Sequence, residues 1–391
     1  MKNVHSGRSV LLMSIVLVSA LGGGAAGTLL GVCGPFSDVS DATFCPFVLE
    51  IFTLGITTGT SPTTYDPTGT VSRLQMAAFL SRTVDGVLKR GGRRAALSQY
   101  WTAEANAALA LTTVGTGPQF AISDGEDLWV ANQTGASVSR VHGRDGRLLQ
   151  TWTGATNAVG VLSAIGRVFV TGFGNPSHLY RIDPSLAPGA VTTVATLGGG
   201  SLGIAYDGSR IWTANNDGSI SIAIPSSTIP WTVTTVAGAS NLYGALFDGA
   251  NVWVTNAPGP GLGTVLKLDS AGSILQTVTV GNAPAYPVFD GANVWVPNNG
   301  AASVSVLRAS NGTVLATLTG NGLNEPGSAA FDGQRILVTN LAAGANSVSI
   351  WKAADLTPLG SFGTGTAPNK ACSDGINFWI TLNSANQLAR F

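Results

Sequence analysis

Charge is scarce in this sequence. Only 10% of its 391 residues are charged, and 20 basic residues balance 20 acidic ones, whereas soluble domains average about 25% charged residues. A nucleic-acid-binding protein needs a basic surface that neutralises phosphates, so the zero net charge argues against that class. The 45% hydrophobic content also excludes a largely disordered chain, which would combine low hydrophobicity with high net charge.

Cysteine and histidine are rarer still, at three residues each. Three cysteines are too few for a disulfide-based scaffold. Beyond the extreme N-terminus the histidines are His142 and His178, and neither is spaced with other ligands as a zinc site requires. The Gly-x-Ser-x-Gly, His-Glu-x-x-His and phosphate-loop motifs are missing as well. We therefore predict no metal and no cofactor.

Long apolar runs are missing except near the start. Lys2 and Arg8 precede an apolar run over residues 10–21, and small residues follow over 22–27. A charged start, a short apolar core and a small-residue exit are typical of a secretory signal peptide, and the run is too short to span about 30 Å of hydrocarbon. We predict a signal peptide at residues 1–27 and no transmembrane span in the mature chain. A retained membrane anchor is the alternative.

Residues 34–85 have the pattern of a small helical domain. Asp38 or Ser40 would cap a first helix, and Gly55 would end it. Val71 and Ser72 mark the start of a second helix. The apolar residues that recur at helical spacing in the first helix are Phe44, Phe47, Val48, Ile51, Phe52 and Leu54.

The order Phe-Ser-Asp-Val, then Gly-Ile-Thr-Thr-Gly, then Tyr-Asp-Pro-Thr-Gly-Thr-Val-Ser-Arg-Leu-Gln resembles an S-layer homology domain. This resemblance implies binding to a cell-wall polymer, either a polysaccharide or peptidoglycan. In that family the second helix usually begins with Thr-Arg-Ala-Glu, in three copies. This chain has one copy, reading Ser-Arg-Leu-Gln. The polymer-contacting residues implied by the resemblance are Asp38, Ser72, Arg73 and Gln75, although Arg73 could also be an ordinary solvated helix residue.

Cys33 and Cys45 bracket the expected start of the first helix. In the oxidising environment outside the cytoplasm we favour a disulfide between them, and two unpaired buried thiols are the alternative. Residues 86–103 look like a linker and hold a basic cluster. That cluster is either a solvated tether or a contact for anionic wall polymer or phospholipid. Its members are Lys89, Arg90, Arg93 and Arg94.

From residue 104 to 391 the chain repeats itself with a period near 42 residues. The repeats are marked by an Asp-Gly pair, and one degenerate copy has Ala164-Ile165-Gly166 in its place, which makes seven. Asp-Gly between alternating apolar residues is a strong hairpin signal, because its turn needs positive φ. The Asp-Gly pairs begin at Asp124, Asp207, Asp248, Asp290, Asp332 and Asp374.

Each repeat has four short strands, which at this spacing indicates a β-propeller blade. In order they are exemplified by residues 287–289, 253–256, 303–306 and 314–318. The last repeat lacks its fourth strand, and a spare one over 108–114 precedes the first repeat. Joining them would close the ring and remove a sheet edge. We predict a seven-bladed all-β propeller, preceded by the small α-helical domain; six or eight blades are the alternatives.

These repeats resemble the YncE/NHL-like group of secreted propellers and, more loosely, the streptogramin lyase propeller. Propellers host unrelated activities, so this resemblance predicts a fold rather than a function. Phe169 and Leu337 replace the tryptophan of the second strand in two repeats, so this position is expected to be core. The tryptophans are Trp129, Trp212, Trp253, Trp295 and Trp379.

Three other repeated features have structural interpretations. The Asp-Gly aspartates are interpreted as turn formers. The asparagine after the second strand is expected to bond its own backbone. Cys372 should be a buried small apolar residue. The asparagines are Asn132, Asn215, Asn256, Asn298 and Asn340.

Polar or aromatic residues at one end of the ring could line a shared pocket. This end, the mouth, is built from the connections between blades and those between each blade's second and third strands. Side chains from different blades would converge there, or they are ordinary rim polarity. The candidates are Tyr243, Tyr286, Glu325, Lys370 and Asn369.

These observations predict an exported protein of the prokaryotic cell surface or periplasm. Its helical domain would attach to wall polymer, and its propeller would present a binding or scaffold surface for a protein or glycan ligand. Two alternatives remain open: a lyase or hydrolase with its site at the mouth, and a structural component of a surface lattice.

Overall fold

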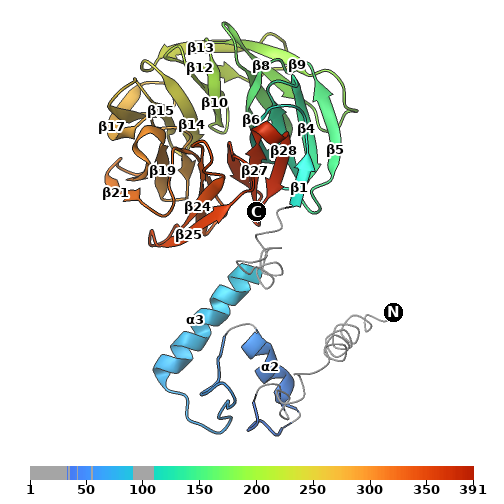
Figure 1. Cartoon of the computed structure of the whole chain (residues 1–391), viewed down its shortest axis with the longest axis vertical. Coiled ribbons are helices and arrows are strands. Elements are labelled where there is room, and N and C mark those ends of the chain that lie inside the picture. The colour runs from blue at the N-terminus through green and yellow to red at the C-terminus, as the bar shows by residue number, and fades with distance from the viewer. Residues whose placement is uncertain (1–32, 34–35, 42, 54–55, 91–109) are drawn as a thin grey trace. The chain divides into compact units, whose positions relative to one another are not determined.

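A computed structural model describes residues 33, 36–41, 43–53, 56–90 and 110–391. The chain divides into two compact units, Met1–Gln99 and Tyr100–Phe391 (Figure 1). The predicted signal peptide and residues 91–103 of the predicted linker lie outside the described residues. Within the described residues, no helix is long and apolar enough to cross a membrane.

The N-terminal unit contains helices α2 (Cys45–Thr53) and α3 (Arg73–Arg90). α3 begins directly after Ser72, as predicted. It continues to Arg90, so the first part of the predicted linker, residues 86–90, is helical. The second helix therefore extends further than the apolar pattern indicates.

The predicted start of the first helix was wrong. Asp41, not Asp38 or Ser40, precedes the helix as its cap: the Asp41 carboxylate accepts the backbone N–H of Thr43 at 2.8 Å, and its carbonyl accepts that of Cys45 at 3.0 Å. Asp38 is used elsewhere, because its carboxylate accepts the backbone N–H groups of Tyr65 and Asp66. A carboxylate can satisfy a distant loop as readily as a helix end, and sequence spacing does not distinguish the two.

The C-terminal unit is a seven-bladed propeller, which confirms the predicted fold class. Seven four-stranded antiparallel sheets form the blades around a ring (Figure 1). β1 (Ala110–Thr113) pairs with β28 (Gln387–Arg390), in register from Ala110 opposite Arg390 to Thr113 opposite Gln387. With β26 (Ala371–Ser373) and β27 (Phe378–Leu382) these strands form blade seven. The N-terminal strand thus closes the last blade and covers its open edge.

The other six blades follow chain order. Blades one to three are β2 (Pro118–Ser123), β3 (Asp127–Asn132), β4 (Ser137–His142), β5 (Leu148–Thr153); β6 (Ala158–Ala164), β7 (Arg167–Gly172), β8 (Ser177–Ile182), β9 (Thr192–Leu197); and β10 (Ser201–Tyr206), β11 (Ile211–Asn215), β12 (Ser219–Ile224), β13 (Thr232–Ala237). Blades four to six are β14 (Leu242–Phe247), β15 (Val252–Asn256), β16 (Leu262–Leu268), β17 (Ile274–Asn282); β18 (Val288–Phe289), β19 (Asn293–Asn298), β20 (Ser303–Arg308), β21 (Val314–Thr319); and β22 (Pro326–Phe331), β23 (Arg335–Asn340), β24 (Ser347–Lys352), β25 (Pro358–Gly363). Short 3₁₀ turns follow β19 and β27, at Asn299–Ala301 and Asn383–Ala385.

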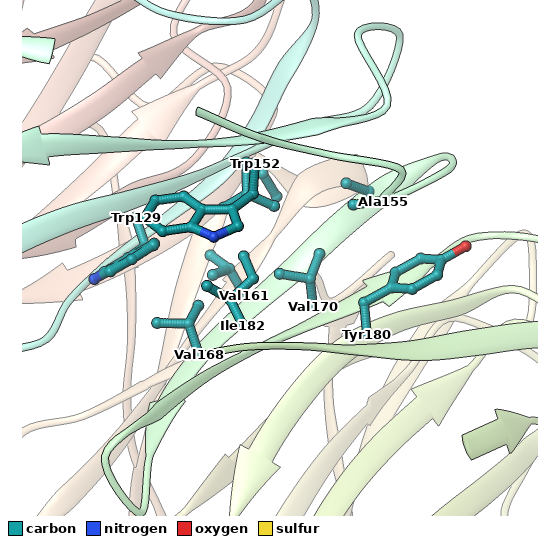
Figure 2. Close-up of a cluster of buried hydrophobic side chains, with 11 residues drawn as sticks. Trp129, Trp152, Ala155, Val161, Val168, Val170, Tyr180 and Ile182 are labelled. Atoms are coloured by element: carbon teal, nitrogen blue, oxygen red, sulfur yellow. The ribbon is translucent and has the colours of Figure 1, made fainter. Parts of the chain in front are cut away.

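The core lies between neighbouring blades. Trp129 and Trp152 of blade one pack with Val161 and Val170 of blade two in one such interface (Figure 2). Every large residue predicted for the second strand is fully buried, at 0% exposure, so the core interpretation is confirmed. These residues are Trp129, Phe169, Trp212, Trp253, Trp295, Leu337 and Trp379.

Five of the six Asp-Gly turns are tied to this core by a tryptophan, and in the sixth, at Asp332, the core position holds Leu337. The Asp290 carboxylate accepts the backbone N–H of Asn293 at 2.6 Å and the indole N–H of Trp295 at 2.7 Å, while Gly291 supplies the positive φ of the turn, 98°. The aspartates are turn formers, as predicted, and five of them also satisfy a buried indole donor. Four further pairs repeat this bond: Asp124–Trp129, Asp207–Trp212, Asp248–Trp253 and Asp374–Trp379.

The asparagine that ends the second strand in five blades does something different from what its sequence context predicts. The Asn298 amide is fully buried and donates to the hydroxyls of Ser303 and Ser305 on the next strand, at 3.1 and 3.0 Å. The expected bond to its own backbone was therefore wrong. Asn132, Asn215 and Asn340 each bond two serines of the following strand in the same way.

Replacing Asn298 by alanine should lower the free energy of unfolding by about 1–3 kcal/mol, because the hydroxyls of Ser303 and Ser305 lose their buried partner. Urea denaturation followed by circular dichroism measures this. The matched control is Gln334→Ala, since Gln334 is exposed and its side chain makes no hydrogen bond within the described residues. Equal losses in the two variants would contradict a structural role for the asparagine.

Candidate functional site

A polar groove of about 330 Å³ lies on the N-terminal unit. Hydroxyl, amide, carboxylate and guanidinium groups line it together with the aromatic rings of Tyr65 and Phe79, a mixture that suits hydrogen bonding to a polyhydroxylated ligand. The guanidinium of Arg82 also donates to the carbonyl of Ile56 at 3.1 Å, which positions it at the groove. The polar lining residues are Thr57, Thr58, Thr60, Tyr65, Asp66, Thr70, Gln75 and Arg82.

Of the four residues predicted to contact wall polymer, two bond each other. The Ser72 hydroxyl accepts the backbone N–H of Gln75 at 3.2 Å, and the Gln75 side chain accepts that of Ser72 at 2.8 Å. This reciprocal capping box starts α3. It also explains the glutamine in place of the family's acid, because either side chain can fill that position of the box.

The other two predicted residues have contrasting environments. Asp38 holds the loop at Tyr65 and Asp66, and these backbone hydrogen bonds lower the pKa of its carboxyl. Arg73 is exposed, and within the described residues its guanidinium makes no hydrogen bond or ion pair. Of the four residues predicted to contact wall polymer, Arg73 is therefore the one whose side chain is available to a ligand.

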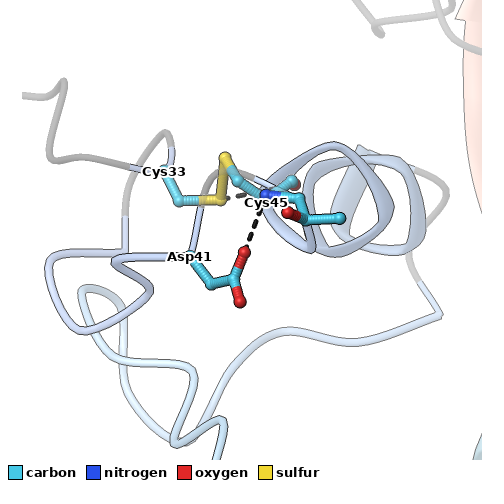
Figure 3. Close-up of a disulfide and its surroundings, with 4 residues drawn as sticks. Cys33, Asp41 and Cys45 are labelled. Atoms are coloured by element: carbon cyan, nitrogen blue, oxygen red, sulfur yellow. Dashed lines mark hydrogen bonds between the residues drawn. A yellow bond between two sulfur atoms is a disulfide. The ribbon is translucent and has the colours of Figure 1, made fainter.

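A disulfide joins Cys33 to Cys45, with the two Cα atoms 5.4 Å apart (Figure 3). It ties the segment before Phe36 to the first turn of α2. Phe36 is the centre of the small core, with its ring 5.1 Å from that of Phe52 and 5.6 Å from that of Tyr65. So few buried side chains stabilise a unit of this size only weakly, which makes the disulfide an important constraint.

In the propeller, a cavity of about 280 Å³ occupies the central channel. The first strands of all seven blades contribute to it, and its lining contains no charged side chain. Cys372 lines it and is 7% exposed, as expected of a small apolar residue. Burial raises the pKa of the Cys372 thiol, so this cysteine stays neutral.

Three of the predicted mouth residues meet at this cavity, and one of them, Tyr286, lines it. The Lys370 ammonium of blade seven lies 4.6 Å from the ring centroid of Tyr286 in blade five. The Tyr286 ring in turn lies 6.4 Å from that of Tyr243 in blade four. Asn369 joins them, because its side-chain oxygen accepts a hydrogen bond from the Lys370 ammonium at 3.1 Å.

Lys370 is the charged centre of this group. It is 7% exposed, and burial lowers the pKa of its ammonium to about 8. Within the described residues no carboxylate contacts it. Burial, followed by the nearby Tyr243, raises the pKa of the Tyr286 phenol, so the Tyr286 ring acts as a neutral partner of the cation.

Glu325 does not join this group. Its side chain is exposed, and only its backbone carbonyl is bonded to neighbours, the Asn299 amide among them. The catalytic alternative places Glu325 in one pocket with Tyr243, Tyr286 and Lys370, and in the structure Glu325 lies apart from the other three. The described residues contain no cluster of three or more His, Cys, Asp or Glu side chains able to hold a metal ion.

Two further residues that contact this group were not predicted from the sequence. Phe120 of blade one lies 4.6 Å from Tyr286, ring centre to ring centre, and 5.8 Å from the Lys370 ammonium. Gln119 accepts a hydrogen bond from the Asn369 amide at 2.8 Å. Aligning the repeats could have found Phe120, because it stands four residues before an Asp-Gly aspartate, as do Tyr286 and Lys370.

Comparison with known proteins gives a different kind of match for each of the two units. The family model described as "S-layer homology domain" matches residues 35–77, and this match indicates a cell-surface or envelope-associated protein. No curated protein matches the chain.

Solved structures resemble the propeller. Hydrazine synthase of Kuenenia stuttgartiensis aligns with a TM-score of 0.61 at 16% identity, over 72% of this chain and 96% of that one. A streptogramin B lyase structure aligns at 0.58 and 15%, over 72% and 97%, and the WD40 β-propeller domain of Doa1 at 0.58 and 13%, over 73% and 95%. At these identities the likeness establishes the fold alone. The narrower relation to the YncE/NHL-like group stays a prediction.

Proposed function

We propose that this chain is a cell-envelope protein whose N-terminal unit attaches it to cell-wall polymer and whose propeller is a binding module. The observation that carries the proposal is the S-layer homology match over residues 35–77. The polar groove on the same unit supports it, since hydroxyl and amide groups beside a tyrosine ring suit a glycan.

Arg73 is the proposed polymer contact. Ser72 and Gln75 cap each other and Asp38 holds a loop, so these three act as positioning residues. An exposed guanidinium at the start of α3 can donate to anionic or hydroxyl groups of a polymer. We keep to a binding role for the propeller, because the Glu325 carboxylate lies outside the group formed by Tyr286 and Lys370.

Replacing Arg73 by alanine should weaken attachment to purified cell walls about tenfold, the loss of one charge-assisted hydrogen bond. The full chain is mixed with walls, sedimented, and the bound fraction measured against wall concentration. The matched control is Arg308→Ala, which removes an exposed arginine of the propeller whose side chain has no partner within the described residues.

Wall preparations with and without their secondary polysaccharide identify the polymer. Binding that survives its removal indicates peptidoglycan, and binding that disappears indicates the polysaccharide. If the chain fails to sediment with either preparation, or if the Arg73 and Arg308 variants bind alike, the proposed anchoring is wrong.

A further inference from the structure

Seven positions around the channel are equivalent by strand register. In each blade one residue of the first strand pairs with the large buried residue of the second strand, as Ile122 pairs with Trp129, Val288 with Trp295 and Cys372 with Trp379. The equivalent position lies two residues before that paired residue. Four positions hold small residues and three hold large ones. Around the ring they are Phe120, Gly160, Gly203, Gly244, Tyr286, Ser328 and Lys370.

The small residues at this level follow from close approach of the strands. A Cβ at Gly203 would lie 2.5 Å from the backbone nitrogen of Ala245 in the next blade. Phe120, Tyr286 and Lys370 depart from this pattern, and all three meet across the channel. Three large side chains therefore meet at a level of the channel where the other four blades carry small residues.

The polar capacity of this group is only partly used. The Lys370 ammonium has three N–H donors, and within the described residues one goes to the Asn369 oxygen. The hydroxyls of Tyr243 and Tyr286 make no hydrogen bond within those residues either. Within the described residues the buried Lys370 ammonium has no counter-ion, and the hydroxyls of the half-buried Tyr243 and Tyr286 are accessible to an external ligand.

The chemistry of the group restricts what that ligand can be. One cation without a neighbouring acid favours a single negative charge and disfavours a zwitterion, whose own ammonium would lack a partner. The remaining groups are aromatic rings and neutral donors or acceptors, including the amides of Asn369 and Gln119. Aromatic faces and neutral hydrogen-bonding groups suit the C–H faces and hydroxyls of a pyranose.

We propose that the propeller mouth binds a carboxylate-bearing sugar unit, with the carboxylate on the Lys370 ammonium and the sugar against Tyr243 and Tyr286. This inference rests on the proposed binding role of the propeller, but not on wall attachment by the N-terminal unit.

Titration calorimetry of the full chain tests the proposal with glucuronate, glucose and acetate as probes. Glucuronate should bind about tenfold or more tightly than either of the others, because glucose lacks the charge and acetate lacks the ring. Glucose binding equal to that of glucuronate would overturn the role of the ammonium. Acetate binding equal to that of glucuronate would overturn the sugar.

Replacing Lys370 by methionine keeps an unbranched side chain of nearly the same length and removes its charge. This variant should lose about tenfold or more of the glucuronate affinity, while Glu325→Gln, at the same end of the ring but outside the group, should keep it. Full affinity in the Lys370 variant would overturn the proposal.

A pH series on the unmodified chain gives a second test that needs no variant. With the pKa of Lys370 at about 8, the cation is present at pH 7 and mostly lost at pH 9, so glucuronate affinity should fall about tenfold between them. The titratable groups that face the ammonium are the phenols of Tyr286 and, behind it, Tyr243. Glucuronate binding that is unchanged at pH 9 would contradict the assignment.

The Arg73→Ala variant should bind glucuronate as the unmodified chain does. This result distinguishes failure of the propeller site from failure of the wall attachment.

Discussion

Replacing Trp295 by alanine is expected to lower the free energy of unfolding of the propeller by about 3–5 kcal/mol, the usual loss for a large buried aromatic side chain. Trp295 is fully buried and packs with Ala329, Ile336 and Val338 of the next blade. The substitution therefore opens a cavity between two blades. It also leaves the Asp290 carboxylate without its indole donor. Urea denaturation followed by circular dichroism measures the loss.

Trp295→Phe is the matched control, because Phe169 occupies the equivalent position in blade two. Phenylalanine fills most of the space and removes the indole N–H, so this variant should lose about 1–3 kcal/mol. If the alanine variant is no less stable than the phenylalanine variant, packing between blades does not hold the ring together.

Breaking the disulfide between Cys33 and Cys45 is expected to unfold the N-terminal unit while the propeller stays folded. The bond closes a loop with a sequence separation of 12 residues, and its loss removes about 3 kcal/mol. A core built on Phe36, Val39 and Val48 has little stability to spare. Hydrogen exchange of the reduced full chain should show lost protection in α2 and α3 and unchanged protection in the strands.

Cys372→Ala is the control for the thiol chemistry of this experiment. Cys372 is the buried unpaired cysteine of β26, so the substitution should leave exchange in α2 and α3 as it is. Retained protection of both helices after reduction would show that the unit does not depend on its disulfide.

Repetition made the propeller predictable from the sequence. A residue that is Trp in five repeats, Phe in one and Leu in another can only be core, and an Asp-Gly pair at constant spacing defines the hairpin before it. The spare strand before the first repeat predicted the closure, which the pairing of Ala110 with Arg390 confirms. Each of these inferences drew on several copies of the same local signal.

Features that occur once could not be predicted in the same way. The start of α2 was misplaced because Asp38, Ser40 and Asp41 are all competent caps, and only the fold shows that Asp38 serves the loop at Tyr65. At the mouth, local sequence selected Tyr286, Lys370 and Glu325 together, but Tyr286 and Lys370 are in contact whereas Glu325 lies outside their group. Contacts across a ring depend on where each blade points its side chain, which no single repeat encodes.

Sedimentation with purified cell walls, before and after reduction of the Cys33–Cys45 disulfide, tests attachment through the N-terminal unit. We expect the oxidised chain to sediment with the walls. The reduced chain, with its N-terminal unit unfolded and its propeller intact, should stay in the supernatant. Equal sedimentation of the oxidised and reduced chains, with hydrogen exchange showing α2 and α3 unfolded in the latter, would contradict attachment through this unit.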